Sequence, residues 1–213
     1  MKRRVLPAAL LAAGLLVGVT GAYGSAARAG TPAPPAALAV SAITAPAADH
    51  NDQDVMFARM MIPHHRQAVE MGRLAENRAA DPRVARLARR IEAAQAPEIQ
   101  TMSGWLTAWG ERVPGESPAP AHHAMPGMMS AEDMRRLEGL SGRAFDRAFL
   151  TMMIRHHEGA VAMARDELRA GVYEPARRMA ASIVSSQSAE IREMKGLLGQ
   201  AAATPYGGPS PHR

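Results

Sequence analysis

An internal repeat constrains the fold of this chain more than any other feature. Seventeen residues return 92 residues later with ten identities, as Phe57-Ala-Arg-Met-Met-Ile-Pro-His-His-Arg-Gln-Ala-Val-Glu-Met-Gly-Arg73 and Phe149-Leu-Thr-Met-Met-Ile-Arg-His-His-Glu-Gly-Ala-Val-Ala-Met-Ala-Arg165. Twelve more return at the same offset with six identities, as Gln95-Ala-Pro-Glu-Ile-Gln-Thr-Met-Ser-Gly-Trp-Leu106 and Gln187-Ser-Ala-Glu-Ile-Arg-Glu-Met-Lys-Gly-Leu-Leu198. A fixed offset indicates duplication of one structural unit. The chain is therefore predicted to contain two copies of that unit.

Both copies have the composition of helices. They are rich in Ala, Met, Leu, Arg and Glu, with few β-branched or aromatic residues. Capping residues, prolines and glycines predict long helices and one short helix, over about residues 51–77, 81–110, 130–139, 141–171 and 174–199. A helical hairpin cannot bury its apolar stripe alone, so two hairpins should close into an all-α four-helix bundle. We expect this bundle at 51–200, with hairpin one at 51–110, a loop at 111–130 and hairpin two at 131–200.

The first 29 residues have the organisation of a secretory signal peptide. Lys2, Arg3 and Arg4 precede a long uncharged apolar run, and Ala27-Arg28-Ala29 supplies a small-x-small cleavage pattern. An uncleaved anchor is the alternative, because the uncharged run is long enough to cross a bilayer. After cleavage we expect no membrane span, a flexible Ala- and Pro-rich linker over 30–50 and a disordered tail over 201–213. The protein should then be secreted or extracytoplasmic.

The charge of the chain argues against a nucleic-acid partner. The formal net charge is +5, but residues 1–29 hold four basic and no acidic residues, so cleavage leaves +1. A nearly neutral protein lacks the basic surface that nucleic-acid binding requires. The sequence is also compatible with a homo-oligomer.

The chain has no Cys and 15 Met. The absence of Cys excludes a disulfide scaffold, a Cys-ligated zinc site, an iron–sulfur cluster and a Cys nucleophile. Any soft metal must therefore be bound through methionine.

Helical projection places the repeated histidines on the buried stripes. At about 100° per residue, both histidines of each copy flank the line through Met61 or Met153. Glu98 and Glu190 lie on the apolar stripes of the companion helices and need partners, either those histidines or a metal shared with them, because an unpaired buried charge is costly. The candidate metal ligands are His64, His65, His156, His157, Met61, Met71, Met153, Met163, Glu98, Glu190, Met102 and Met194.

The loop between the hairpins holds a third, lower-ranked cluster of soft ligands. It consists of His122, His123, Met125, Met128 and Met129. The alternative is a linker whose methionines pack loosely on the bundle.

Pro63 precedes the first histidine pair and has no counterpart in the second copy, where Arg155 stands. It produces either a tolerated kink or a kink that re-aims the histidines.

These motifs resemble the bacterial domain of unknown function 305 family. The resemblance rests on the doubled Met-Met-Ile-x-His-His motif, the Gln-x-x-Glu-Ile-x-x-Met companion and the lead-in Asp133-Met-Arg-Arg-Leu-Glu-Gly-Leu-Ser141 over roughly residues 50 to 200. It implies a ferritin-like four-helix bundle and, for some members, copper sequestration outside the cytoplasm. The Glu-x-x-His pattern of ferritins is absent, because Met61 and Met153 occupy the carboxylate positions.

Ligand chemistry agrees with copper. Thioether and imidazole together select Cu(I) in preference to Cu(II), with zinc or iron as alternatives, whereas hard cations want more carboxylates. The leading hypothesis is an exported protein that binds or sequesters copper through Met and His. A ferritin-like metal-dependent oxidase and a metal-free helical interaction module of the envelope are the alternatives, and the sequence favours binding over catalysis.

Overall fold

The computed structural model describes residues 50–115 and 125–203. Within these ranges the chain forms five helices and no strand: α1 (Asp52–Arg78), α2 (Pro82–Ala108), α3 (Ala131–Glu138), α4 (Gly142–Ala170) and α5 (Glu174–Ala203). The predicted all-α bundle of two repeated hairpins is confirmed. The predicted signal peptide, nearly all of the linker, and His122 and His123 lie outside the described residues, as does the tail from residue 204.

The helices begin at the capping residues that the sequence indicates. The Asn51 side chain accepts hydrogen bonds from the backbone N–H groups of Gln53 and Asp54, and Asp81 caps α2 ahead of its first proline. Ser130 and Asp133 form a reciprocal capping box at α3. Caps satisfy N–H groups that have no partner inside the helix, so they set where each helix starts.

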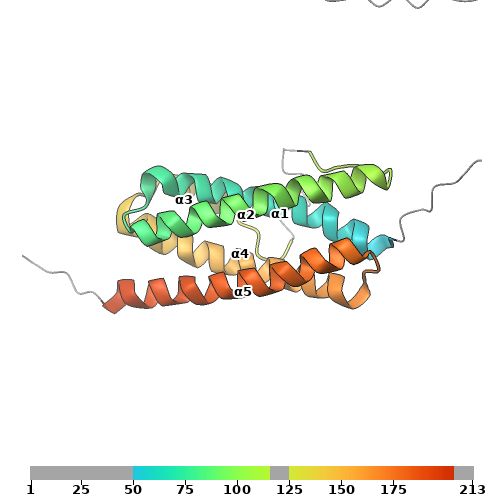
Figure 1. The fold of residues 1–213 in the computed structure, drawn as a ribbon. Helices are drawn as coiled ribbons and strands as arrows, with labels where there is room; N and C mark the ends of the chain where they lie inside the picture. The colour runs from blue at the N-terminus through green and yellow to red at the C-terminus, as the bar shows by residue number, and fades with distance from the viewer. Residues whose placement is uncertain (1–49, 116–124, 204–213) are drawn as a thin grey trace, which may run out of the picture. The chain divides into compact units, whose positions relative to one another are not determined.

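The long helices form two antiparallel hairpins, α1 with α2 and α4 with α5 (Figure 1). The hairpins meet mainly through α1 and α4, which also run antiparallel. The start of α1 lies at the end of α4, where Asn51 Nδ2 donates to the Ala170 carbonyl at 2.8 Å. The end of α1 lies at the start of α4, where Ala79 and Gly142 form an isolated bridge. Helix α1 continues through Pro63, which is buried.

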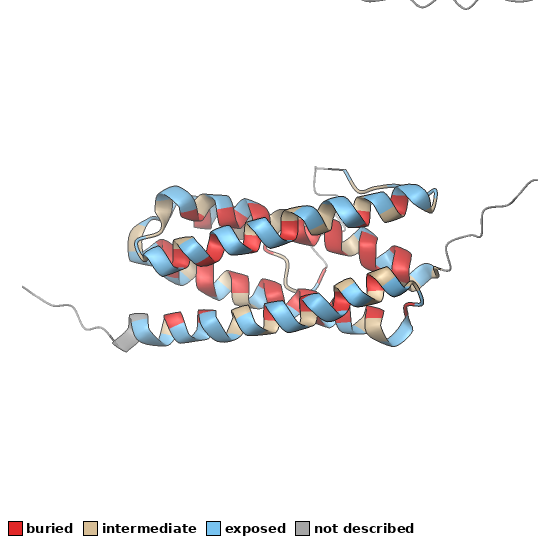
Figure 2. Ribbon diagram, in the orientation of Figure 1, coloured by how far each residue is buried: buried red, intermediate tan, exposed pale blue. Residues whose placement is uncertain are grey.

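The apolar core consists of two clusters, one in each half of the bundle. The first joins the end of α1 and the start of α2 to the start of α4 and the end of α5, and includes Met71, Ile91, Phe149, Met153 and Met194. The second joins the four opposite helix halves and includes Phe57, Met61, Met102, Met163 and Ile183. In Figure 2 the buried residues follow the inward stripes of the helices along their length.

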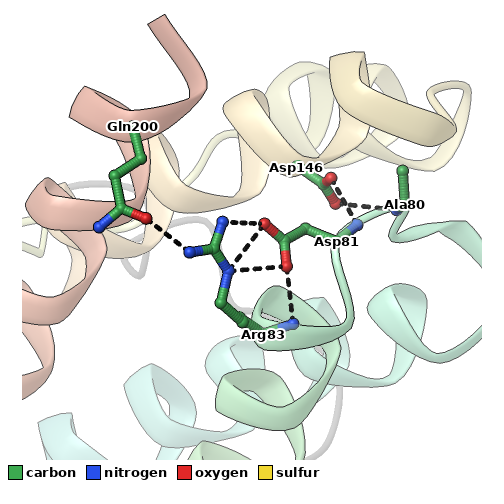
Figure 3. A network of polar contacts seen from close by, with 5 residues as sticks. All are labelled: Ala80, Asp81, Arg83, Asp146 and Gln200. Carbon is green, nitrogen blue, oxygen red and sulfur yellow. Dashed lines mark hydrogen bonds and ion pairs between the residues drawn. The ribbon is translucent and has the colours of Figure 1, made fainter. Parts of the chain in front are cut away.

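Two buried aspartates brace each hairpin against the other. On α4, Asp146 accepts hydrogen bonds from Ala80 N at 3.1 Å and Asp81 N at 2.9 Å in the α1–α2 turn (Figure 3). On α1, Asp54 accepts from Val172 N at 3.1 Å and Tyr173 N at 3.0 Å in the α4–α5 turn. Asp54 and Asp146 are one repeat offset apart in the sequence, and the two turns that they hold are also one offset apart. The duplication therefore has an approximate twofold symmetry in space.

Candidate metal centre

The four repeated histidines are buried completely in the middle of the bundle. His64, His65, His156 and His157 each have 0% of their surface exposed. They come from the midpoints of α1 and α4, between the residues of the two apolar clusters. We call these four side chains the imidazole layer.

Two members of the imidazole layer are hydrogen-bonded to carboxylates of the companion helices. His65 Nε2 lies 2.7 Å from Glu98 Oε2, and His157 Nε2 lies 2.8 Å from Glu190 Oε2. The sequence left two kinds of partner open for these carboxylates, the histidines or a metal shared with them, and in the structure the carboxylates contact the histidines. A carboxylate on one ring nitrogen fixes the orientation of the imidazole and makes the other nitrogen a better donor to a metal. Glu98 and Glu190 can therefore orient the histidines without binding a metal themselves.

The other two members pack against each other across the two hairpins. The rings of His64 and His156 have centroids 3.7 Å apart and an interplanar angle of 39°. His64 Nε2 lies 3.1 Å from the Pro126 carbonyl oxygen, and a carbonyl can only accept, so Nε2 carries the proton. Burial, together with the neighbouring His65, lowers the pKa of His64 to about 3, and burial lowers the pKa of His156 well below its usual range. Both rings are therefore neutral at physiological pH.

Every ring of the imidazole layer has a nitrogen without a partner. Among the residues that the structure describes, the buried Nδ1 atoms of all four histidines and Nε2 of His156 make no hydrogen bond. Buried polar atoms without partners cost free energy, and they are uncommon in folded proteins. Neutral imidazole nitrogens are the commonest metal ligands in proteins. The layer thus has the donor chemistry of a metal site.

The predicted methionine ligands are all buried, at different levels of the bundle. Met61, Met102, Met153 and Met194 have no exposed surface and lie one helical turn from the layer or from its Glu98 and Glu190 partners. Met71 and Met163 lie seven residues from His64 and His156, which is about 10 Å along a helix. They share a helix face with the histidines and lie deep in the two apolar clusters.

The end of the interhelical loop packs over the imidazole layer. Met125 and Met129 are buried and Met128 is partly buried. Gln67 on α1 pairs with the backbone of Met129 through both its amide nitrogen and its amide oxygen, at 2.9 and 2.7 Å. On α4 a Cβ atom at Gly159 would lie 2.0 Å from the Pro126 carbonyl oxygen, so only glycine allows this approach. The loop methionines thus lie against the bundle near the predicted site.

Carboxylates and imidazoles alone do not complete a site in this part of the molecule. Over residues 50–115 and 125–203 no group of three or more His, Cys, Asp or Glu side chains is placed to hold a metal ion. The thioethers of the nearby buried methionines are further donors available to a soft metal at the imidazole layer.

Several buried polar residues lie outside the set of ligands predicted from the sequence. Gln95 and Gln187 each expose 3% of their surface, and within the described chain their Oε1 atoms have no partner. Asp54 and Asp146 are identical residues one repeat offset apart, and this signal in the sequence could have identified them as a functional pair. Glu167, buried beside Asp54, has no repeated counterpart, since Ala75 stands at that position.

Comparison with protein families identifies the repeated bundle. The model of the domain of unknown function named DUF305 matches residues 54–198, which span both hairpins except for the first residues of α1 and the last residues of α5. The chain belongs to the DUF305 family. A search among curated proteins finds no significant match.

Solved DUF305 structures share the fold over nearly their whole length. A protein from Streptomyces coelicolor, described as secreted, is 36% identical, with 71% of this chain and 95% of that chain covered and a TM-score of 0.65. A DUF305 fragment from Deinococcus radiodurans is 37% identical, with 70% and 97% covered and a TM-score of 0.64. CopM in its Cu(II)-bound form is 33% identical, with 69% and 96% covered and a TM-score of 0.61.

Proposed function

We propose that this DUF305 protein binds copper, preferentially Cu(I), through histidine and methionine side chains in the centre of its bundle. The observation that carries the proposal is the imidazole layer, in which four buried rings each keep a nitrogen without a hydrogen-bond partner. The layer lies between clusters that contain buried methionines, so soft donors are available on both sides. Imidazole with thioether is a donor set that favours Cu(I).

The relatives support the same chemistry. CopM has been solved in Cu(I)-bound, Cu(II)-bound and Ag-bound forms, and its Cu(I)-bound form is 34% identical to this chain with a TM-score of 0.59. The family contains a member that binds these ions on the same fold. Zinc and iron remain weaker alternatives for this chain, because neither prefers thioether ligands.

The residues around the layer prepare it for a metal ion. Glu98 and Glu190 orient two imidazoles, and the low pKa values of His64 and His156 keep two more rings unprotonated. Methionine needs no deprotonation and cannot form disulfides, so it suits an oxidising compartment. We propose an extracytoplasmic location, which the S. coelicolor relative supports and the first 29 residues predict. None of the helices that the structure describes is long and apolar enough to cross a membrane.

A competition titration tests the proposal. The purified protein is titrated with Cu(I) against a chromogenic Cu(I) chelator, beside a variant in which His64, His65, His156 and His157 are all replaced by Ala. We expect the wild type to withdraw copper from the chelator and the variant to lose most of this capacity. A His122→Ala/His123→Ala variant separates any contribution of the loop.

Two results would contradict copper binding at this centre. One is an affinity no better than about millimolar, which corresponds to only about 4 kcal/mol of binding free energy. The other is an affinity unchanged in the quadruple variant. Oxygen consumption by the iron-loaded protein would favour the oxidase alternative instead.

A further inference from the structure

The register of the bundle can be derived from contacts across the imidazole layer. The His65–Glu98 and His157–Glu190 hydrogen bonds set the relative heights of the helices in each hairpin. The ring contact between His64 and His156 sets the height of α1 against α4. Since neighbouring helices are antiparallel and rise about 1.5 Å per residue, the level of every inward-facing residue follows.

The bundle has one level of inward-facing residues a helical turn above the imidazole layer and another a turn below it. Both levels contain the same four residue types. On the side of the α1–α2 turn, the inward residues at a height of about 5 Å are Ala68, Gln95, Met153 and Met194. On the side of the α4–α5 turn they are Ala160, Gln187, Met61 and Met102. We call these sets the upper and lower Met₂Gln layers. The repeat relates them residue by residue.

Burial supports both layers. The four methionines and two alanines have no exposed surface, and the two glutamines expose 3% each. Met153, Met194 and Ala68 belong to one apolar cluster, and Met61, Met102 and Ala160 to the other. Each layer also has a glutamine Oε1 with no hydrogen-bond partner in the described chain. Two thioethers thus lie level with an amide oxygen that nothing else satisfies.

We propose that each Met₂Gln layer binds one soft monovalent cation together with the adjacent imidazoles, so that the bundle holds two equivalent ions. This proposal rests on the proposed copper-binding function and specifies its sites. In each layer both methionines come from one hairpin and the glutamine from the other. The alanine contributes only a methyl group, which leaves the centre of the layer to the longer side chains.

The donor set specifies the charge and softness of the ion. Thioether and amide donors are neutral, and a monovalent ion loses less solvation energy than a divalent one when it enters a dry core. Thioethers select Cu(I) over harder ions, and Ag(I) shares this preference. Binding would join the two hairpins at two levels, since neither hairpin supplies a complete layer.

Methionine-to-leucine pairs test the proposal. Leucine has nearly the volume of methionine, so such pairs should preserve the packing of the core. In a His122→Ala/His123→Ala background, the equivalents of Ag(I) or Cu(I) bound in competition with a chelator are counted by metal analysis after desalting. We expect two equivalents in that background, one after Met153→Leu/Met194→Leu and one after Met61→Leu/Met102→Leu.

A matched control uses the methionines that lie two turns from the imidazole layer. The Met71→Leu/Met163→Leu variant changes the same number of buried methionines and should keep both equivalents. Gln95→Leu should weaken one ion and leave the second unchanged. Circular dichroism and urea unfolding verify that each variant is folded.

The possible failures distinguish this proposal from the proposed function. If the background protein binds no ion with useful affinity, copper binding itself is wrong. If it binds a single ion, or if one methionine pair removes both ions or neither, copper binding stands and the two-layer proposal is overturned. Loss of an equivalent in the Met71→Leu/Met163→Leu control would overturn it as well.

Discussion

At the scale of single residues, Glu167 is an unusual buried group outside the imidazole layer. Its carboxyl lies against Asp54 and the backbone of Gly171, with no exposed surface. Burial, together with the charge and hydrogen bond of Asp54, raises the pKa of Glu167 to about 8. Burial also acts to raise the pKa of Asp54, but hydrogen bonds from Glu167 and three backbone N–H groups lower it overall. At neutral pH the pair therefore holds one proton, with Glu167 protonated and Asp54 ionised.

This proton predicts a pH dependence of stability. A raised pKa in the folded state means that the native protein binds the proton more tightly, so stability is full below the ordinary pKa of Glu and falls as the pH rises toward 8. Glu167→Gln keeps a hydrogen-bond donor and removes the titration. Between pH 5 and pH 8 we expect the wild type to lose about 3 kcal/mol of unfolding free energy that the variant keeps.

Urea unfolding at several pH values measures this difference. Glu158→Gln is the control: it lies on α4 like Glu167, removes only an exposed ion pair with Lys195 on α5, and should show no such trend. Parallel pH curves for the wild type and Glu167→Gln would rule out the protonated Glu167.

At the scale of elements, the bracing aspartates link secondary structures far apart in the sequence. Asp146 satisfies two N–H groups of the α1–α2 turn, and without it these groups lose their acceptor. We expect Asp146→Ala to lower the free energy of unfolding by about 2 kcal/mol. Asp133→Ala, which removes an exposed helix cap, should cost about 1 kcal/mol. Thermal unfolding followed by circular dichroism compares them, and equal costs would show that bracing contributes nothing beyond a cap.

The docking of the loop on α4 depends on one glycine. At Gly159 an added Cβ atom would lie 2.0 Å from the Pro126 carbonyl oxygen, whereas at Gly104, also within a helix, nothing lies within 4 Å. Gly159→Ala should therefore destabilise the protein by about 2 kcal/mol, because the loop must move. Gly104→Ala should stabilise it by up to about 1 kcal/mol, because alanine is the better helix former.

Chemical denaturation midpoints of the two glycine variants provide the measurement. A gain in stability for Gly159→Ala would mean that the loop does not pack on α4 in solution.

At the scale of the whole molecule, the buried imidazoles make the metal-free bundle sensitive to acid. His64 and His156 stay neutral when folded because burial lowers their pKa values, but they take up protons when the chain unfolds. The folded pKa is the lower one, so stability is full above the ordinary pKa near 6.5 and is lost as the pH falls below it. His64, with a folded pKa of about 3, should contribute a loss of about 2 kcal/mol between pH 7 and pH 5, and His156 should contribute a loss in the same direction.

His156→Phe tests the share of one ring in this acid sensitivity. The variant should lose less stability than the wild type between pH 7 and pH 5, because it lacks the buried His156 ring that takes up a proton on unfolding. Groups remote from the imidazole layer titrate alike in both proteins, so the difference reports His156 together with the rings coupled to it. Identical losses measured by urea unfolding at pH 7 and pH 5 would show that the ring is protonated in the folded state.

Much of this architecture follows from local pattern. Capping predicts that helices start at Asn51, Asp81 and Ser130, because a cap depends on residues only a few positions apart. Periodicity likewise predicts the two hairpins and the inward positions of the paired histidines. The sequence predicts that Glu98 and Glu190 have a partner, either the histidines or a metal shared with them, because a carboxylate on an apolar stripe needs one. Which histidine each one contacts could not be predicted in this way.

Periodicity and repetition along the chain are enough to predict a duplicated helical hairpin whose inner faces carry His, Met and Glu, and the absence of Cys means that any soft-metal site must use methionine. The packing of the helices sets which of these side chains share a level: His64 lies against His156, Gln95 is level with Met153 and Met194, and Met71 is about 10 Å from the histidines. The same packing brings Asp54 to a turn 118 residues away. The physical reason is that periodicity fixes the face of a helix locally, whereas the register between helices depends on all the side chains that pack between them.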